Sequence, residues 1–146
     1  MNQPTYVAES QGRAAVGLPD PIGTPEQAVT LLSELAEFDR ESFMVLALNA
    51  RHAPIAPAET VSVGSVNASI VHPREVFRCA IQRGAVALLV AHNHPNGDPE
   101  PSAEDIAITK RLVDAGELLG IGLLDHIITA RGGAWLSMRA RRMGGL

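Results

Sequence analysis

The sequence contains little cysteine and few aromatic residues. Its single cysteine, Cys79, excludes an intramolecular disulfide and a zinc site built from pairs of cysteines. Because Cys79 lies in the apolar stretch VFRCAI, we expect a buried thiol in a helix rather than a nucleophile. Aromatic residues make up 3% of the 146-residue chain, so Val, Leu, Ile and Ala must supply the core. This length suits one domain with a single core.

The chain also lacks excess positive charge and long apolar runs. Its formal net charge is −4, and strong non-specific DNA binding is therefore not expected. The exception is RARRM at residues 139–143, which we interpret as a solvated, frayed terminus; contact with an acidic partner is the alternative. No apolar stretch reaches the roughly 18 residues of a membrane span, and no signal-peptide pattern is present. We expect a cytoplasmic protein without membrane contact.

Proline, glycine and periodicity divide the chain into three parts. Residues 1–23 show no sustained pattern and predict a flexible N-terminal arm. Residues 24–138 predict one domain, and residues 139–146 form a basic C-terminal tail. Thr24 is placed to cap a helix that runs to Phe38. The predicted buried face of this helix consists of Ala28, Leu31, Leu32, Leu35 and Ala36.

The rest of the domain mixes strands and helices without strict βαβ alternation. Strands are predicted at residues 41–49, 54–66, 85–91, 118–130 and around Trp135. The first two should pair antiparallel, with a bulge or turn at Gly64. Helices are predicted at residues 72–84, ended by Gly84, and 102–116, capped by Ser102 and ended near Gly116. The fold class is α/β or α+β, with a mixed central β-sheet flanked by helices.

The stretch AHNHPNGDPEPSAED, residues 91–105, carries the strongest chemical signal. Side chains two residues apart on a strand point to the same side, so His92 and His94 can converge while Asn93 faces away. A stiff loop rich in proline and glycine can then turn the chain back, so that the next helix begins close to the histidines. Asp105, in the first turn of the next helix, can supply an oxygen ligand. Such a set leaves a fourth position open, as catalytic zinc sites require.

Each part of this stretch also has a purely structural interpretation. Ser102 and Asp105 form an S-x-x-D capping box, and a lone H-x-H occurs by chance in many proteins. The combination of an H-x-H at a strand end, a stiff loop and an aspartate at a helix start favours a metal site. Chance does not explain why all three occur in one short stretch, whereas a shared metal ion requires all three.

The same stretch resembles a known family. HNHPNGDPEPSAED is similar to the H-x-H-P-x6-S-x-x-D signature, the JAMM motif, of JAB/MPN metalloproteases, and VHPREV and LLDHII resemble its bacterial RadC branch. The resemblance covers about residues 24–138 and implies a cytidine-deaminase-like JAB/MPN architecture. It also implies that His92, His94 and Asp105 bind Zn²⁺ and that Ser102 assists the substrate carbonyl or the oxyanion.

Two features depart from the RadC pattern. The chain reads HPNG where RadC proteins usually read HPSG, so Asn96 replaces a serine outside the ligand set, and we expect little effect on the metal. RadC proteins usually also carry an N-terminal helix-hairpin-helix region, which residues 1–23 are too short to form. This departure removes the part of the family most suited to contact DNA and counts against direct DNA binding.

A zinc hydrolase also needs a general base close to the attacking water. In the family this glutamate lies between the first helix and a buried strand, and FDRESFMVLAL matches that position with Glu41. Without the resemblance, Glu41 would be interpreted as a solvated residue after a helix. Glu75 in HPRE is the second candidate, although it also suits the dipole of a helix first turn. Glu59 is the third.

The remaining histidines give weaker signals. His126, in the apolar stretch LLDHII, is either hydrogen-bonded beside the site or a satisfied core histidine, and we favour the core histidine. His72, before Pro73, is interpreted as a capping or turn residue. His52 is expected to be exposed in a loop.

These observations support three functional hypotheses. The first is a zinc-dependent hydrolase of peptide or isopeptide bonds with a peptide or protein substrate. The second is a DNA-repair-associated or mobile-element accessory module that acts through a protein or nucleic-acid partner without peptidase turnover. The third is a metal-binding scaffold without turnover, and the presence of every ligand type counts against it. The natural substrate and the oligomeric state are not predicted.

Overall fold

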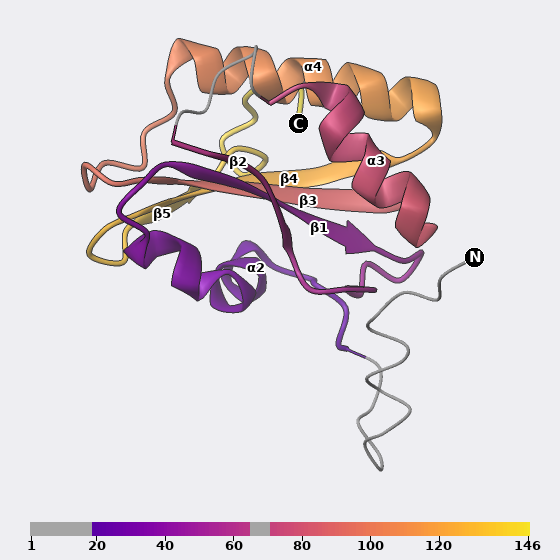
Figure 1. Cartoon of the computed structure of the whole chain (residues 1–146), viewed down its shortest axis with the longest axis horizontal. Helices are drawn as coiled ribbons and strands as arrows, with labels where there is room; N and C mark the ends of the chain where they lie inside the picture. The colour runs from indigo at the N-terminus through magenta and orange to yellow at the C-terminus, as the bar shows by residue number, and fades with distance from the viewer. Residues whose placement is uncertain (1–18, 65–70) are drawn as a thin grey trace.

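A single mixed sheet organises the computed structural model, which describes residues 19–64 and 71–146 (Figure 1). Within these residues, five strands pair in the order β2-β1-β3-β4-β5. β1 is antiparallel to β2 and β3, β3 is parallel to β4, and β5 is antiparallel to β4. The strands are β1 (Ser42–Leu48), β2 (Glu59–Val63), β3 (Ala87–His94), β4 (Gly122–Ala130) and β5 (Trp135–Ser137). The predicted fold class and the antiparallel pairing of the first two strands are confirmed.

Helices cover both faces of this sheet (Figure 1). The helices α3 (Pro73–Arg83) and α4 (Ala103–Leu119) pack on one face, and α2 (Pro25–Leu31) and the 3₁₀ helix η1 (Ser33–Glu37) pack on the other. Alternate residues of β3 therefore enter opposite cores: Leu88 and Val90 face α3 and α4, whereas Leu89 and Ala91 face α2. This burial on both faces explains the continuous apolar run of β3.

The first predicted helix is interrupted. Thr24 forms the predicted capping box with Gln27, but α2 ends at Leu31 and the chain continues as the 3₁₀ helix η1. Ala28, Leu32 and Leu35 are buried as predicted. Leu31 is 57% exposed, so its predicted place in the buried face is wrong: Ala28 and Leu32, four residues apart, share the side of the helix that faces the sheet, and Leu31 lies about 100° around the helix from Leu32.

The second predicted helix is confirmed closely. His72 caps α3, and its Nδ1 accepts a hydrogen bond from the Arg74 backbone N–H at 3.2 Å. Gly84 ends the helix with a left-handed conformation, φ 67°. Cys79 is buried in α3, and burial raises the pKa of its thiol to about 11.

The third predicted helix continues past the glycine expected to end it. Gly116 lies inside α4, and Gly120, with φ 71°, caps the helix instead. A Cβ at Gly116 would lie 2.3 Å from the backbone oxygen of Ile121. The absence of a side chain at Gly116 therefore lets the backbone of Ile121 pack against the helix, and it does not end the helix. As a consequence β4 begins at Gly122, not at residue 118.

The C-terminal residues pack against α4, so the prediction of a frayed terminus is wrong, whereas residues 139–142 are exposed to solvent as predicted (Figure 1). Leu146 packs against the core, and a Cβ at Gly144 would come within 2.7 Å of Thr109. Asp125 on β4 also accepts hydrogen bonds from the Ser137 hydroxyl and the Arg139 backbone N–H. The tail is therefore part of the folded structure.

The remaining expectations divide between described and undescribed residues. Gly64 has φ 104° in a bend after β2, and the register shift of the β1–β2 pair falls between Phe43 and Met44. Most of the expected N-terminal arm, residues 1–18, and residues 65–66 of the second predicted strand lie outside the described residues. In the described part of the chain, every helix is too short or too polar to cross a bilayer.

Candidate metal centre

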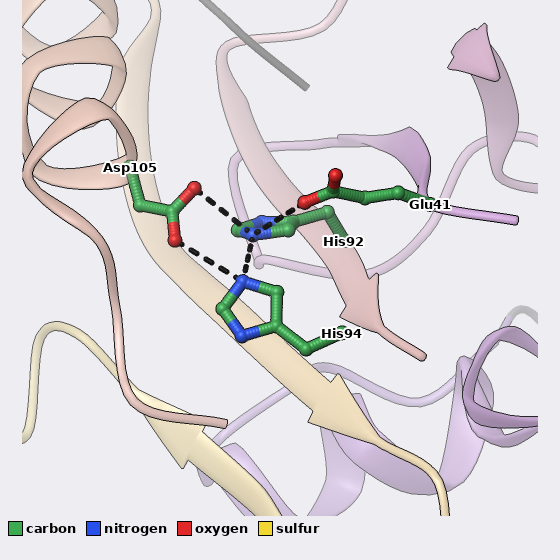
Figure 2. Close-up of side chains that lie close together, drawn as sticks. All are labelled: Glu41, His92, His94 and Asp105. Carbon is green, nitrogen blue, oxygen red and sulfur yellow. Dashed lines mark hydrogen bonds and ion pairs between the residues drawn. The ribbon is translucent and has the colours of Figure 1, made fainter. Parts of the chain in front are cut away.

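Two histidines converge at the C-terminal end of β3. The strand continues through His94, so His92 and His94 lie on the same side of the sheet, as the i and i+2 spacing predicts (Figure 2). Their Nε2 atoms are 2.9 Å apart. The His92 side chain is fully buried and stacks on Phe43, and the His94 side chain is 13% exposed. The pair thus opens toward solvent on the His94 side.

Asp105 reaches the two histidines from the first turn of α4 (Figure 2). Its Oδ1 lies 3.2 Å from His92 Nε2, and its Oδ2 lies 3.1 Å from His94 Nε2. Oδ2 also accepts a hydrogen bond from the Ser102 backbone N–H at 2.8 Å, and the Ser102 hydroxyl accepts one from the Asp105 backbone N–H. The capping box is therefore present, and it holds the carboxylate against the histidines.

Glu41 completes the group from the residue before β1 (Figure 2). Its Oε1 lies 4.0 Å from His92 Nε2, and its side chain is 30% exposed. The two other candidate glutamates lie elsewhere: Glu59 pairs with Arg83, and Glu75 pairs with Arg74 and Arg78. Of the three candidates, only Glu41 lies near the histidines.

Asn93 fixes the backbone on both sides of Glu41, a role that the sequence did not reveal. Its Oδ1 accepts a hydrogen bond from the Ser42 N–H at 2.7 Å, and its Nδ2 donates to the carbonyl oxygens of Phe38 and Arg40, each at 3.1 Å. The side chain is fully buried on the α2 side of β3. The residue that faces away from the histidines therefore holds the segment that carries Glu41.

The four side chains could hold one metal ion. Glu41, His92, His94 and Asp105 each offer a ligand atom, and these atoms all lie within 4.8 Å of one another. Two imidazole nitrogens with carboxylate oxygens form a donor set that suits several divalent transition metals. The geometry therefore supports a metal centre without specifying the metal.

The charges of the group favour a cation. Burial alone would raise the pKa of Asp105, but hydrogen bonds with His92 and His94 outweigh it and hold this pKa well below its ordinary value. The hydrogen bond to Asp105 raises the pKa of His94, against the effect of burial. An ionised carboxylate is thus held between two imidazoles, which is the state in which it binds a positive ion.

His126 lies directly behind His92. It is fully buried on β4, and its Nε2 is 2.7 Å from His92 Nδ1. Its Nδ1 is 2.6 Å from the Thr109 hydroxyl, and burial lowers its pKa well below the ordinary value. Both interpretations of His126 therefore hold: it is a satisfied core histidine, as favoured, and it also hydrogen-bonds beside the site. His52 is exposed, as predicted.

A cavity of about 590 Å³ opens beside the group. Ser102 lines it, close to Asp105 but outside the four-residue group. Its lining includes five carboxylates, from Glu41, Asp98, Glu100, Glu104 and Asp105. Glu100 also pairs with Arg141 at 3.0 Å. The lining of the cavity is therefore acidic.

Relatives of this chain are found among bacterial proteins. UPF0758 proteins of Desulforamulus reducens and Alkaliphilus metalliredigens are 52% and 56% identical over 108 residues, 73% of this chain and 47% and 46% of those proteins. A UPF0758 protein of Moorella thermoacetica is 49% identical over 113 residues, 77% of this chain and 48% of that protein. The chain thus spans about half the length of the curated relatives it matches. The RadC-like JAB domain matches residues 22–143, so the chain belongs to the RadC-like JAB domain family.

Proposed function

We propose that the chain is a zinc-dependent hydrolase of peptide or isopeptide bonds. The observation that carries this proposal is the convergence of ligand atoms from Glu41, His92, His94 and Asp105 within 4.8 Å. In the proposal, His92, His94 and Asp105 are the protein ligands, because the contacts between their ligand atoms are 2.9 to 3.2 Å long. Zn²⁺ accepts such nitrogen and oxygen ligands, and three protein ligands leave a position open.

When bound, Zn²⁺ would polarise a carbonyl group and make a nearby water more acidic. The chain's own residues would supply the remaining chemistry. The proposal gives Glu41 the role of general base: its carboxylate takes a proton from water, the water oxygen bonds to the carbonyl carbon, the C–N bond breaks, and the proton passes to the leaving nitrogen. Glu41 lies farther from His92 Nε2, at 4.0 Å, than Asp105 does, and its side chain is 30% exposed, which supports a role beside the ligands rather than as one of them.

Ser102 is proposed to stabilise the substrate carbonyl oxygen. Its hydroxyl oxygen accepts a hydrogen bond from the Asp105 backbone N–H at 3.1 Å, which orients the hydroxyl and leaves its hydrogen able to donate. The residue lines the acidic cavity next to the proposed ligands. A single donor of this kind lowers the barrier by about 3 kcal/mol where it meets developing negative charge.

The acidic cavity favours a peptide or protein substrate over a nucleic acid. Five carboxylates line it, and the chain's net charge of −4 adds no compensating field. A phosphate backbone entering this cavity would meet like charges. The proposal therefore places an uncharged or basic peptide segment in the cavity.

The test is hydrolysis of a peptide library by zinc-loaded protein. We expect cleavage by the native chain and a loss of at least about 100-fold in Glu41→Gln with zinc content unchanged. Glu75→Gln is the matched control, because Glu75 lies on α3 in ion pairs with Arg74 and Arg78, and it should cleave at the native rate. Undiminished cleavage by Glu41→Gln would reject the proposed base, and no cleavage by the native chain would count against peptidase function.

A further inference from the structure

A buried row of hydrogen bonds connects the back of His92 to the backbone of Asp105. His92 Nδ1 lies 2.7 Å from His126 Nε2, and His126 Nδ1 lies 2.6 Å from Thr109 Oγ1. Thr109 Oγ1 in turn lies 2.7 Å from the backbone oxygen of Asp105. All three side chains in this row are fully buried, so bulk water does not compete for these hydrogen bonds.

The positions of the hydrogens follow from the Asp105 end of the row. The carbonyl oxygen of Asp105 carries no hydrogen, so the Thr109 hydroxyl must donate across the 2.7 Å contact. A hydroxyl has one hydrogen, and Thr109 therefore accepts from His126, whose Nδ1 must be protonated. Without that arrangement, two oxygens would face each other at hydrogen-bond distance with no hydrogen between them.

The same reasoning determines which nitrogen of each imidazole carries the hydrogen. Complete burial disfavours a charged His126, so with Nδ1 protonated its Nε2 carries a lone pair. His92 must then donate from Nδ1, so Nε2 is the nitrogen whose lone pair is left for a metal; without a metal, a proton on Nε2 is shared with Asp105. This Nε2 is the atom that faces His94, Asp105 and Glu41. Met138 Sδ, at 3.3 Å, is a weaker and more distant acceptor for the Thr109 hydroxyl and does not change this direction.

We propose that His126 and Thr109 are positioning residues that fix the tautomer of His92, so that its Nε2 presents a lone pair to the metal. The inference rests on the proposed metal site and concerns residues outside the four-residue group. Metal-binding histidines are commonly oriented through their second nitrogen by a carboxylate or a carbonyl. Here a second histidine takes that place, and the row ends on the backbone of Asp105, whose carboxylate lies at the site.

The first test reads the tautomers directly. Long-range ¹H–¹⁵N correlation spectra of the protein, recorded with a chelator and again with added Zn²⁺, distinguish protonated from unprotonated imidazole nitrogens. We expect His126 protonated at Nδ1 only in both spectra and, with Zn²⁺ bound, His92 protonated at Nδ1 and unprotonated at Nε2. A His126 protonated at Nε2 would overturn the inference. This readout needs no turnover.

The second test compares zinc affinity in paired variants, measured by competition with a chromophoric chelator. Thr109→Val keeps the shape but removes the hydroxyl, and His126→Leu removes both nitrogens; each should bind zinc about 10- to 100-fold more weakly. Thr109→Ser and His126→Gln retain a donor and an acceptor and should recover most of the affinity. His52→Gln, at an exposed position, is the unaffected control.

The outcomes separate this inference from the proposed function. Native affinity in folded Thr109→Val would overturn the inference even if His126→Leu fails to fold. Zinc binding without peptide cleavage would contradict the hydrolase alone and leave both tests valid. An absence of zinc binding by the native chain would contradict the inference as well.

Discussion

At the scale of single residues, Asp105 combines two roles that the sequence presented as alternatives. Its side chain belongs to the capping box of α4 and also contacts His92 and His94. The two roles are compatible because the Ser102 N–H and the histidines approach the carboxylate from different directions. The sequence predicted the residue types and spacing of this contact, because period-two strand geometry and capping rules are local.

Asp105→Asn should separate these roles. The amide oxygen can still accept from the Ser102 N–H, whereas a neutral amide is a poor ligand for a divalent cation. We expect zinc to be lost with little loss of stability, and Asp105→Ala to lose zinc and also about 1 kcal/mol of unfolding free energy. Zinc content and urea unfolding in the presence of chelator measure both effects. Full zinc content in Asp105→Asn would show that this carboxylate is not a ligand.

His126 should make the stability of the metal-free chain depend on pH. Burial lowers its folded-state pKa well below 6.5, so below this value the unfolded chain binds a proton that the folded chain does not. The contribution of His126 should therefore destabilise the native chain as the pH falls below about 6.5, by up to about 1.4 kcal/mol per pH unit.

His126→Gln provides the comparison, because it removes the titratable imidazole at this position. The raised pKa of His94 affects the stability of both proteins and cancels in the difference. The stability advantage of the native chain over His126→Gln should therefore shrink between about pH 7.5 and 5.5. Urea unfolding with chelator at several pH values measures it. An advantage independent of pH would contradict the neutral, buried state of His126.

At the scale of elements, the segment before β1 depends on Asn93 of β3 for its position. Asn93→Ala removes three hydrogen bonds around Glu41, and the buried groups left unpaired should cost about 1 to 3 kcal/mol. Peptide cleavage should fall along with stability. Asn49→Ala, which disturbs a turn away from the site, should lose stability without slowing cleavage by the folded fraction. Equal cleavage by both variants would reject the role of Asn93.

The end of α4 shows why element boundaries were predicted less well than elements. From the sequence, Gly116 was expected to end the helix. In the structure this position requires glycine for another reason, because the backbone of Ile121 passes too close to it for a side chain to fit. Such an approach joins residues across a turn and follows no local rule. The pitch change after Leu31 and the packing of the C-terminal tail likewise depend on tertiary contacts.

Gly116→Ala should therefore destabilise the chain more than a glycine substitution in open space. The added methyl would lie 2.3 Å from the Ile121 oxygen, and the backbone shift should cost about 1 to 3 kcal/mol. Gly122→Ala, with no atom within 4 Å of the added Cβ, is the control and should change stability by less than about 0.5 kcal/mol. Urea unfolding measures both, and equal effects would contradict the close approach.

At the scale of the whole molecule, the sheet assembles the site from segments far apart in sequence. Antiparallel pairing of β1 with β3 brings Glu41 next to His92, and parallel pairing of β3 with β4 brings His126 behind it. The sequence predicted the histidines and Asp105 because they lie within one short stretch. It identified Glu41 only through the family resemblance. It left open whether His126 hydrogen-bonds beside the site, because strand order is not encoded in local patterns.

The most direct test of the central idea is X-ray absorption spectroscopy of the zinc-loaded protein. We expect a shell of nitrogen and oxygen atoms at about 2.0 to 2.2 Å, with the multiple scattering of two imidazoles and no sulfur. A zinc shell without imidazole, or one that contains the sulfur of Cys79, would contradict the shared site of His92, His94 and Asp105.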